Sequence, residues 1–149
     1  MIPFLNLKKI NQPFEIALQE KMEQFLTKGW YILGNEVKTF EADFASYCGA
    51  KHCIGVGNGL DALVLIFKAY IHLGKLQKGD EVIVPANTYI ASILAVLQAD
   101  LVPVLVEPKL ETYNINPDWI EQKITSNTKA ILPVHLYGQL CEMEQINAI

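Results

Sequence analysis

The chain has 149 residues, 51% of them hydrophobic, and carries a formal net charge of −4. This length is enough for a domain with a core of its own, and no apolar run is long enough to cross a bilayer. All 12 basic residues are lysine, whereas nucleic-acid-binding proteins typically have a basic stripe that includes arginine. The composition therefore argues against a membrane protein and against nucleic acid as a partner.

The N-terminus and the cysteines favour a cytoplasmic protein. A secretory signal places its positive charges before its apolar run, but here the apolar residues come first, and Lys8 and Lys9 follow them. The cysteines at positions 48, 53 and 141 form no CxxC pair, which is the spacing of many metal and redox sites. We therefore expect free thiols in a reducing compartment and no bound metal.

The first fifty residues predict two helices. The first is expected over residues 13–28, because proline suits a first helical turn and lysine followed by Gly29 is typical of a helix end. An aromatic stretch, 30–34, separates it from a second helix over residues 35–48. The apolar residues of the second helix recur at helical spacing. They are Val37, Phe40, Phe44 and Tyr47.

From residue 51 onward, short apolar runs alternate with helical patterns. Strands are expected at 53–56, 81–85, 102–106 and 129–133, and helices at 60–73, 89–99, 117–124 and from 140 onward. Strict alternation of strand and helix predicts a mainly parallel sheet. Because the strands are apolar throughout, helices are expected on both faces of that sheet. The predicted organisation is an N-terminal helical segment, 1–50, followed by an α/β domain, 51–149.

A glycine-rich stretch joins the first expected strand to a helix. Gly55, Gly57 and Gly59 leave no Cβ between the backbone and a ligand, and glycine permits positive φ where a turn needs it. The free N–H groups at the start of the helix could bind an anion, best of all a phosphate. Tight packing of a strand on a helix would explain the same glycines, so this stretch alone leaves both interpretations open.

Two further loops are expected at the carboxyl ends of strands, where open α/β sheets bind ligands. They contain Tyr89 and His135. Tyr89 could stack on a planar ligand or form the wall of a helix, and His135 could face a ligand or be satisfied within its loop. Together with the glycine-rich stretch, they would suit a flat, phosphorylated cofactor.

No catalytic nucleophile or metal site is predicted from the residues. The sequence contains no GxSxG and no HExxH motif. A lysine that forms a Schiff base needs an apolar or cationic neighbourhood that lowers its pKa. The lysines of this chain lie in polar turns, at helix ends or on charged faces, so none is expected to be catalytic.

Taken in order, the motifs resemble those of the DegT/DnrJ/EryC1/StrS family of sugar aminotransferases, along the entire chain. The matching segments are Pro3–Leu7, Gly34 with the Phe40-Glu41 helix, Gly57–Leu63, Gly79–Pro85, Asn87–Ala91 and Pro133–Gly138. The resemblance implies the large domain of the type I (aspartate aminotransferase-like) fold and pyridoxal 5′-phosphate as the cofactor. It implies that the backbone N–H groups of Gly59 and Leu60 hold the phosphate, with Asn58 beside it, and that Tyr89 stacks on the pyridine ring.

The resemblance also implies partners. The expected substrates are a nucleotide-linked keto sugar and an amino-acid donor, with glutamate the expected donor, and the expected assembly is a homodimer with a shared active site. Trp30 and Tyr31 are candidates for the sugar-nucleotide site or for the subunit contact. The form Gly-Asn-Gly-Leu-Asp-Ala-Leu at 57–63, together with Val106-Glu107-Pro108, is most similar to enzymes that aminate C3 of dTDP-linked 3-keto-6-deoxyhexoses. Such enzymes serve deoxysugar, polysaccharide or lipopolysaccharide biosynthesis.

Two functional groups of the family have no counterpart in this sequence. The Schiff-base lysine and the aspartate that pairs with the pyridine nitrogen are expected beyond Ile149, so residues 51–149 are expected to be an incomplete cofactor-binding domain, inactive alone. Three alternatives stay open. Some relatives carry histidine in place of the lysine and are sugar dehydratases. The second alternative is a Rossmann-type dinucleotide-binding module, although this sequence lacks the GxGxxG spacing and the ribose-binding acid of such modules. A non-catalytic cofactor-binding or structural module that ends at Ile149 is the third.

Overall fold

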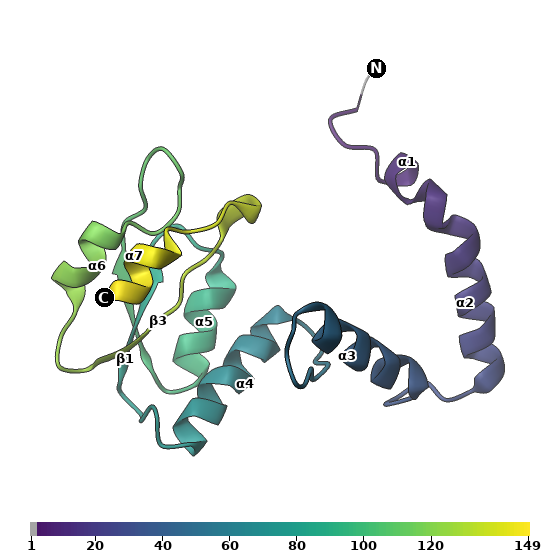
Figure 1. The fold of residues 1–149 in the computed structure, drawn as a ribbon, viewed down its shortest axis with the longest axis horizontal. Helices are drawn as coiled ribbons and strands as arrows, with labels where there is room; N and C mark the ends of the chain where they lie inside the picture. Colours follow the sequence, from purple (N-terminus) through teal and green to yellow (C-terminus); the bar gives the residue numbers. More distant parts are fainter. Residues whose placement is uncertain (1–2) are drawn as a thin grey trace. The chain divides into compact units, whose positions relative to one another are not determined.

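The computed structural model describes residues 3–149 and divides into two compact units at the bond between Gly55 and Val56. The sequence places the corresponding boundary after residue 50. Figure 1 shows the elements of both units in chain order. Each unit is described by itself.

The N-terminal unit is helical. It contains α1 (Leu7–Asn11), a 3₁₀ turn (Gln12–Phe14), α2 (Glu15–Lys28) and α3 (Asn35–Tyr47) (Figure 1). The helix predicted over 13–28 is confirmed as α2. It ends where expected, because Gly29 takes the left-handed conformation with φ 66° that closes many helices.

The apolar side of α3 follows the predicted spacing, but the unit does not bury it. Phe40 and Phe44 stack with their ring centroids 5.6 Å apart, and Tyr47 lies 6.3 Å from Phe44 by the same measure. The exposed fractions of these three residues are 57%, 47% and 87%. The rings therefore pack mainly against one another along the helix.

The prediction of a strand over residues 53–56 is wrong. A strand needs a neighbouring chain that pairs with its N–H and C=O groups, and within residues 3–149 none pairs with this segment. The N–H of Gly55 instead donates to the Glu41 carboxylate at 2.7 Å, and Ile54 is 80% exposed. The segment is a connection without regular secondary structure.

The C-terminal unit is built on a parallel sheet, as predicted. In the part of the chain that the structure describes, the sheet consists of β1 (Glu81–Pro85), β2 (Val102–Val106) and β3 (Thr128–Ile131), in the order β2-β1-β3. Both β2 and β3 run parallel to β1. Leu132 still donates its N–H to Ile83 O at 2.8 Å, and Pro133, which has no N–H, follows it. The predicted strand 129–133 therefore ends earlier than expected.

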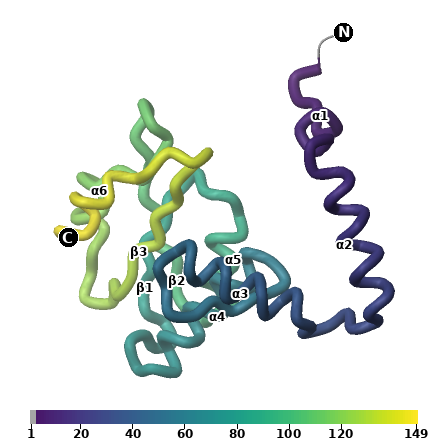
Figure 2. The backbone as a smooth tube through the Cα atoms, turned by 45° about the vertical axis from the view of Figure 1, so that its right-hand side comes forward, coloured from purple at the N-terminus to yellow at the C-terminus, as the bar shows by residue number. Residues whose placement is uncertain are grey.

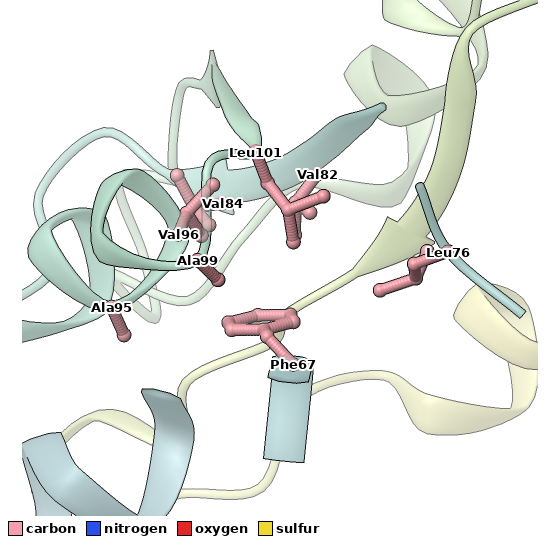
Figure 3. Packing of buried hydrophobic residues seen from close by; sticks show 8 residues of the cluster. All are labelled: Phe67, Leu76, Val82, Val84, Ala95, Val96, Ala99 and Leu101. Atoms are coloured by element: carbon pink, nitrogen blue, oxygen red, sulfur yellow. The ribbon is translucent and has the colours of Figure 1, made fainter. Parts of the chain in front are cut away.

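Strand β1 is the centre of this unit. Its side chains at 82, 83 and 84 are fully buried and point alternately to the two faces of the sheet. On one face, Val82 and Val84 pack with side chains of α4 (Gly59–His72), α5 (Ile90–Gln98) and the turns that follow them (Figure 3). On the other, Ile83 packs with side chains of α6 (Pro117–Lys123) and α7 (Met143–Ala148). The predicted cover of helices on both faces is confirmed.

The last helix begins later than predicted. The sequence predicts it from residue 140, but α7 begins at Met143. The backbone of the preceding residues is engaged elsewhere, because the carbonyls of Gln139 and Leu140 accept hydrogen bonds from the Asn114 side chain at 3.0 and 3.1 Å. The N–H of Cys141 donates to a histidine ring at 3.1 Å. Among residues 3–149, no helix is both long enough and apolar enough to cross a membrane.

Phe67 is the largest side chain of the cluster on the α4–α5 face of the sheet, and it is 5% exposed (Figure 3). We expect Phe67→Ala to lower the free energy of unfolding by about 3–5 kcal/mol, because it leaves a cavity among residues that cannot collapse to fill it. Urea unfolding followed by circular dichroism measures this. Leu65→Ala, on the same helix but 52% exposed, is the control and should lower the free energy of unfolding by no more than about 0.5 kcal/mol. Equal losses for the two variants would contradict the packing described here.

Candidate cofactor site

An open pocket lies between the N-terminal halves of α4 and α5. Its volume is about 800 Å³. The predicted phosphate-binding and ring-stacking residues come from segments about thirty positions apart in the sequence, and the structure brings all four to this one pocket. The lining consists of Asn58, Gly59, Leu60, Ala62, Leu63, Tyr89, Ile90, Ala91 and Leu94.

Asn58 caps α4 and decides which backbone donors stay available. Its Oδ1 accepts from Asp61 N at 3.0 Å, and its Nδ2 donates to Asp61 Oδ2 at 3.0 Å. Its carbonyl accepts from Ala62 N at 3.1 Å. The remaining N–H groups of the first turn belong to Gly59 and Leu60, which have no acceptor within the helix. Two donors at the positive end of the helix dipole therefore remain available at residues that line the pocket.

The glycines before α4 provide space rather than an unusual backbone. None of the glycines at 55, 57 and 59 takes a positive φ. A Cβ on Gly57 would lie 3.1 Å from Asp61 Oδ2, which is tighter than ordinary contact. A Cβ on Gly59 would meet nothing within 4 Å. The backbone at Gly59 is therefore open to a ligand, while Gly57 makes room for the Asp61 carboxylate.

Tyr89 precedes α5 instead of forming part of its wall. Its backbone is extended, with φ −61° and ψ 140°, and its side chain is 78% exposed. The hydrogen bonds at the first turn of α5 do not use the Tyr89 side chain. Ser92 N donates to the backbone carbonyl of Tyr89 at 3.0 Å, and the hydroxyls of Thr88 and Ser92 are 2.8 Å apart. The ring is thus free to contact a molecule in the pocket.

One ring nitrogen of His135 is engaged within its own loop. Its Nδ1 accepts from Cys141 N at 3.1 Å, and Cys141 Sγ donates to Val134 O at 3.1 Å. It does not line the pocket between α4 and α5. Of the two interpretations of this histidine, the structure supports the one in which it stabilises a loop.

Trp30 and Tyr31 belong to the N-terminal unit, where they are about half exposed. The Tyr31 hydroxyl donates to Leu26 O at 3.2 Å, and its ring centroid lies 4.9 Å from that of Phe25. Lys38 Nζ lies 5.8 Å from the centre of the Trp30 ring. Both aromatic side chains thus have partners within their unit, and their role as substrate contacts stays a prediction.

Two asparagines of the C-terminal unit have hydrogen-bond partners that the sequence did not predict. Asn87 Nδ2 donates to Tyr113 O at 2.9 Å, and Asn114, which is 4% exposed, holds the loop after β3 with its side chain. Asparagine is common in turns for local reasons, so its type gave no signal of distant partners. Within residues 3–149, no three His, Cys, Asp or Glu side chains gather as metal ligands.

Comparisons with known proteins agree on one family. The DegT/DnrJ/EryC1/StrS aminotransferase family matches residues 15–149. The chain is 62% identical, over all its 149 residues, to the dTDP-3-amino-3,6-dideoxy-α-D-galactopyranose transaminase of Aneurinibacillus thermoaerophilus, and it covers 40% of that protein.

Solved structures give the same result. The S. venezuelae protein DesV, solved in complex with a ketimine intermediate, has a TM-score of 0.87 and 42% identity over 99% of this chain and 38% of that one. The E. coli GDP-4-keto-6-deoxy-D-mannose-3-dehydratase with bound hydrated PLP has a TM-score of 0.82 and 30% identity over 87% of this chain and 34% of that one. The chain thus spans about two fifths of the length of its curated relative.

The cysteines should differ in reactivity. Cys141 is 5% exposed, and burial raises the pKa of its thiol, whereas Cys48 is exposed. Because only the thiolate reacts and it must also be reached, we expect iodoacetamide at pH 8 to label Cys141 at least about tenfold more slowly than Cys48. Peptide mass spectrometry of timed samples measures both rates. The difference should vanish in guanidinium chloride, and equal rates in the folded chain would contradict the burial of Cys141.

Proposed function

Because the chain belongs to the DegT/DnrJ/EryC1/StrS aminotransferase family, we propose that it supplies the cofactor-anchoring part of a pyridoxal 5′-phosphate-dependent aminotransferase acting on a nucleotide-linked keto-deoxysugar. One observation carries this proposal. A single pocket contains the start of α4, with two available N–H groups, and the exposed ring of Tyr89.

The start of α4 suits the cofactor's phosphate. The N–H groups of Gly59 and Leu60 would donate to it, and the space beside Gly59 admits its oxygen atoms. Hydrogen bonds to a charged group contribute about 1.5–3 kcal/mol each. The carboxylate of Asp61, in the same helical turn, is held by Asn58 Nδ2 near Gly57. Asp61 lines a different hollow of the surface and does not line the cofactor pocket.

The rest of the pocket suits a flat ring. Tyr89 would stack on the pyridine ring, an arrangement that contributes about 0.5–1.5 kcal/mol beyond the area it buries. Apolar side chains of α4 and α5, among them Leu63 and Leu94, line the same pocket and would exclude water from the ring. When bound, the cofactor supplies the chemistry that moves an amino group between an amino acid and a keto sugar. The residues of this chain anchor and orient it.

We propose that the proton-transferring lysine of this enzyme lies outside residues 1–149. No lysine is among the residues that line the described pocket, and the chain covers 40% of its curated relative. We propose the same for the aspartate that pairs with the pyridine nitrogen. The activity is therefore proposed for the full-length protein.

For the substrate, we propose a dTDP-linked 3-keto-6-deoxyhexose that receives its amino group at C3, with glutamate as the donor. The 62% identity to a transaminase named for a dTDP-3-amino-3,6-dideoxy sugar supports this choice. The proposal includes a cytoplasmic homodimer with a shared active site, serving deoxysugar, polysaccharide or lipopolysaccharide biosynthesis, in which Trp30 and Tyr31 contact the nucleotide sugar.

A dehydratase is the second candidate, because a solved sugar dehydratase shares the fold at 30% identity. Both candidates use the same anchoring pocket. The products distinguish them, since an aminotransferase moves nitrogen between its two substrates, whereas a dehydratase removes an oxygen substituent from the sugar.

The function is tested on the full-length protein in the reverse direction. We expect dTDP-3-amino-3,6-dideoxy-α-D-galactose and 2-oxoglutarate to give one glutamate for each keto sugar formed, measured by chromatography and mass spectrometry. The purified protein should also show the visible absorbance of a bound pyridoxal cofactor. Cofactor binding with loss of oxygen from a keto sugar, and no glutamate, would favour the dehydratase. Absence of cofactor absorbance would contradict both.

The phosphate site is tested at Gly59, the first residue of α4. Proline fits that position, because it needs no N–H there and Asn58 before it is extended, with φ −165° and ψ 175°. We expect Gly59→Pro to leave the helix intact and to weaken cofactor binding roughly 10- to 150-fold, the loss of one charge-assisted hydrogen bond. Gly59→Ala keeps the N–H but adds a Cβ in the same place as proline does, so it is the matched control, and Gly59→Pro should bind the cofactor at least about tenfold more weakly than Gly59→Ala. Cofactor titration by absorbance measures both. Equal losses would mean that the N–H is not used.

A further inference from the structure

We infer that Asn114 is a positioning residue that holds the ring of Tyr137 at the carboxyl edge of the sheet, where the ring contacts the nucleotide-sugar substrate. The inference rests on the proposed function. It starts from the loop between β3 and α7, which contains the 3₁₀ turn Leu136–Gly138.

Tyr137 has two features that do not favour folding. Its backbone is left-handed, with φ 53° and ψ 25°, a conformation that is costly for a residue with a Cβ. Its side chain is 100% exposed. A strained residue persists where its surroundings over-determine it, and such residues cluster at functional sites. A large exposed ring on strained backbone therefore calls for a role outside the core.

Asn114 imposes this conformation from another loop. It is 4% exposed and makes three hydrogen bonds with its side chain. Oδ1 accepts from Leu136 N at 3.0 Å, and Nδ2 donates to Gln139 O at 3.0 Å and to Leu140 O at 3.1 Å. These contacts lie on both sides of Tyr137, so the residue is clamped between fixed points.

The clamp is itself anchored to the loop that carries Tyr89. Asn87, two residues before Tyr89, donates from Nδ2 to the carbonyl of Tyr113 at 2.9 Å. Tyr113 is the neighbour of Asn114 in the chain. Two asparagine side chains thus connect the loops that follow β1, β2 and β3.

The topology places both tyrosines at one edge. Strands β1 and β3 are parallel neighbours, so the loops after them, with Tyr89 and Tyr137, emerge on the same side of the sheet. Figures 1 and 2 both draw the loop with Leu136–Gly138 close to the N-terminal end of α5. A nucleotide sugar is longer than the cofactor and must extend out of the pocket. An exposed aromatic ring at the rim is suited to stack on its base or sugar.

Tyr137→Gly in the full-length protein separates the backbone strain at residue 137 from the contact of its ring with the substrate. Glycine takes φ 53° without cost, so the melting temperature should be unchanged or higher. The KM for dTDP-3-amino-3,6-dideoxy-α-D-galactose should rise about tenfold, the loss of one aromatic contact, with the KM for 2-oxoglutarate and the cofactor absorbance unchanged. Tyr137→Phe keeps the ring and should be close to wild type.

Asn114→Ala tests the clamp. It should raise the KM for the sugar in the same way, and adding Tyr137→Gly should give no further rise, because Asn114 acts through the ring. Asn147→Ala, an exposed asparagine of α7, is the matched control and should change nothing. If Asn114→Ala unfolds the protein, the KM of the Tyr137→Gly variant for the sugar alone tests whether the ring contacts the substrate.

Three results would overturn the inference. The first is a wild-type KM for the sugar in an active Tyr137→Gly variant. The second is an additive effect of the two substitutions. The third is conversion of a homodimer to a monomer by Tyr137→Gly, which would make the ring a subunit contact. A wild-type protein without cofactor absorbance or amino transfer would instead overturn the proposed function, and this inference with it.

Discussion

Burial of β1 on both faces is the constraint on which the C-terminal unit depends. Val82, Ile83 and Val84 have no exposed surface, and because alternate side chains point to opposite faces, each face needs its own cover of helices. Helices α4 and α5 supply one cover, and α6 and α7 contribute to the other. Since β2 and β3 both run parallel to β1, the packing that buries the strand also gathers the three following loops at one edge. The position of the site is thus a consequence of the core.

At the start of α4, helix capping and ligand binding use different backbone groups. Asn58 takes the N–H of Asp61 with its side chain and the N–H of Ala62 with its carbonyl, which leaves those of Gly59 and Leu60. The same side chain keeps the Asp61 carboxylate near Gly57, where glycine alone gives it ordinary room. The sequence motif Gly-Asn-Gly-Leu-Asp therefore combines a stable helix start with two free donors, and a negative charge within the same turn is held by the cap.

Features encoded by local pattern could be predicted from the sequence. Strands β1 and β2 and helices α4 to α6 follow from apolar runs and helical spacing. The segment 53–56 has the same apolar pattern as a strand, but pairing depends on a neighbour that periodicity cannot identify. The late start of α7 has a similar cause, since the carbonyl groups before it are bound by a side chain from a different loop.

In the candidate site too, some features could be predicted from the sequence and others depend on partners far away in the chain. The place of Tyr89 after β1 follows from the rule that ligands bind at the carboxyl edge of a parallel sheet, so it could be predicted before the structure. Asn58 follows no strand of the sheet and lies in the same pocket because α4 packs beside α5. The role of Asn114 could not be predicted, because its partners lie 22 to 26 residues away in the sequence. An apolar residue could fill its place, but it would leave three backbone groups of the loop without a partner, and buried polar groups are costly when unpaired. A buried amide with three directional hydrogen bonds therefore specifies one conformation of the Tyr137 loop, which apolar packing alone would leave free to vary.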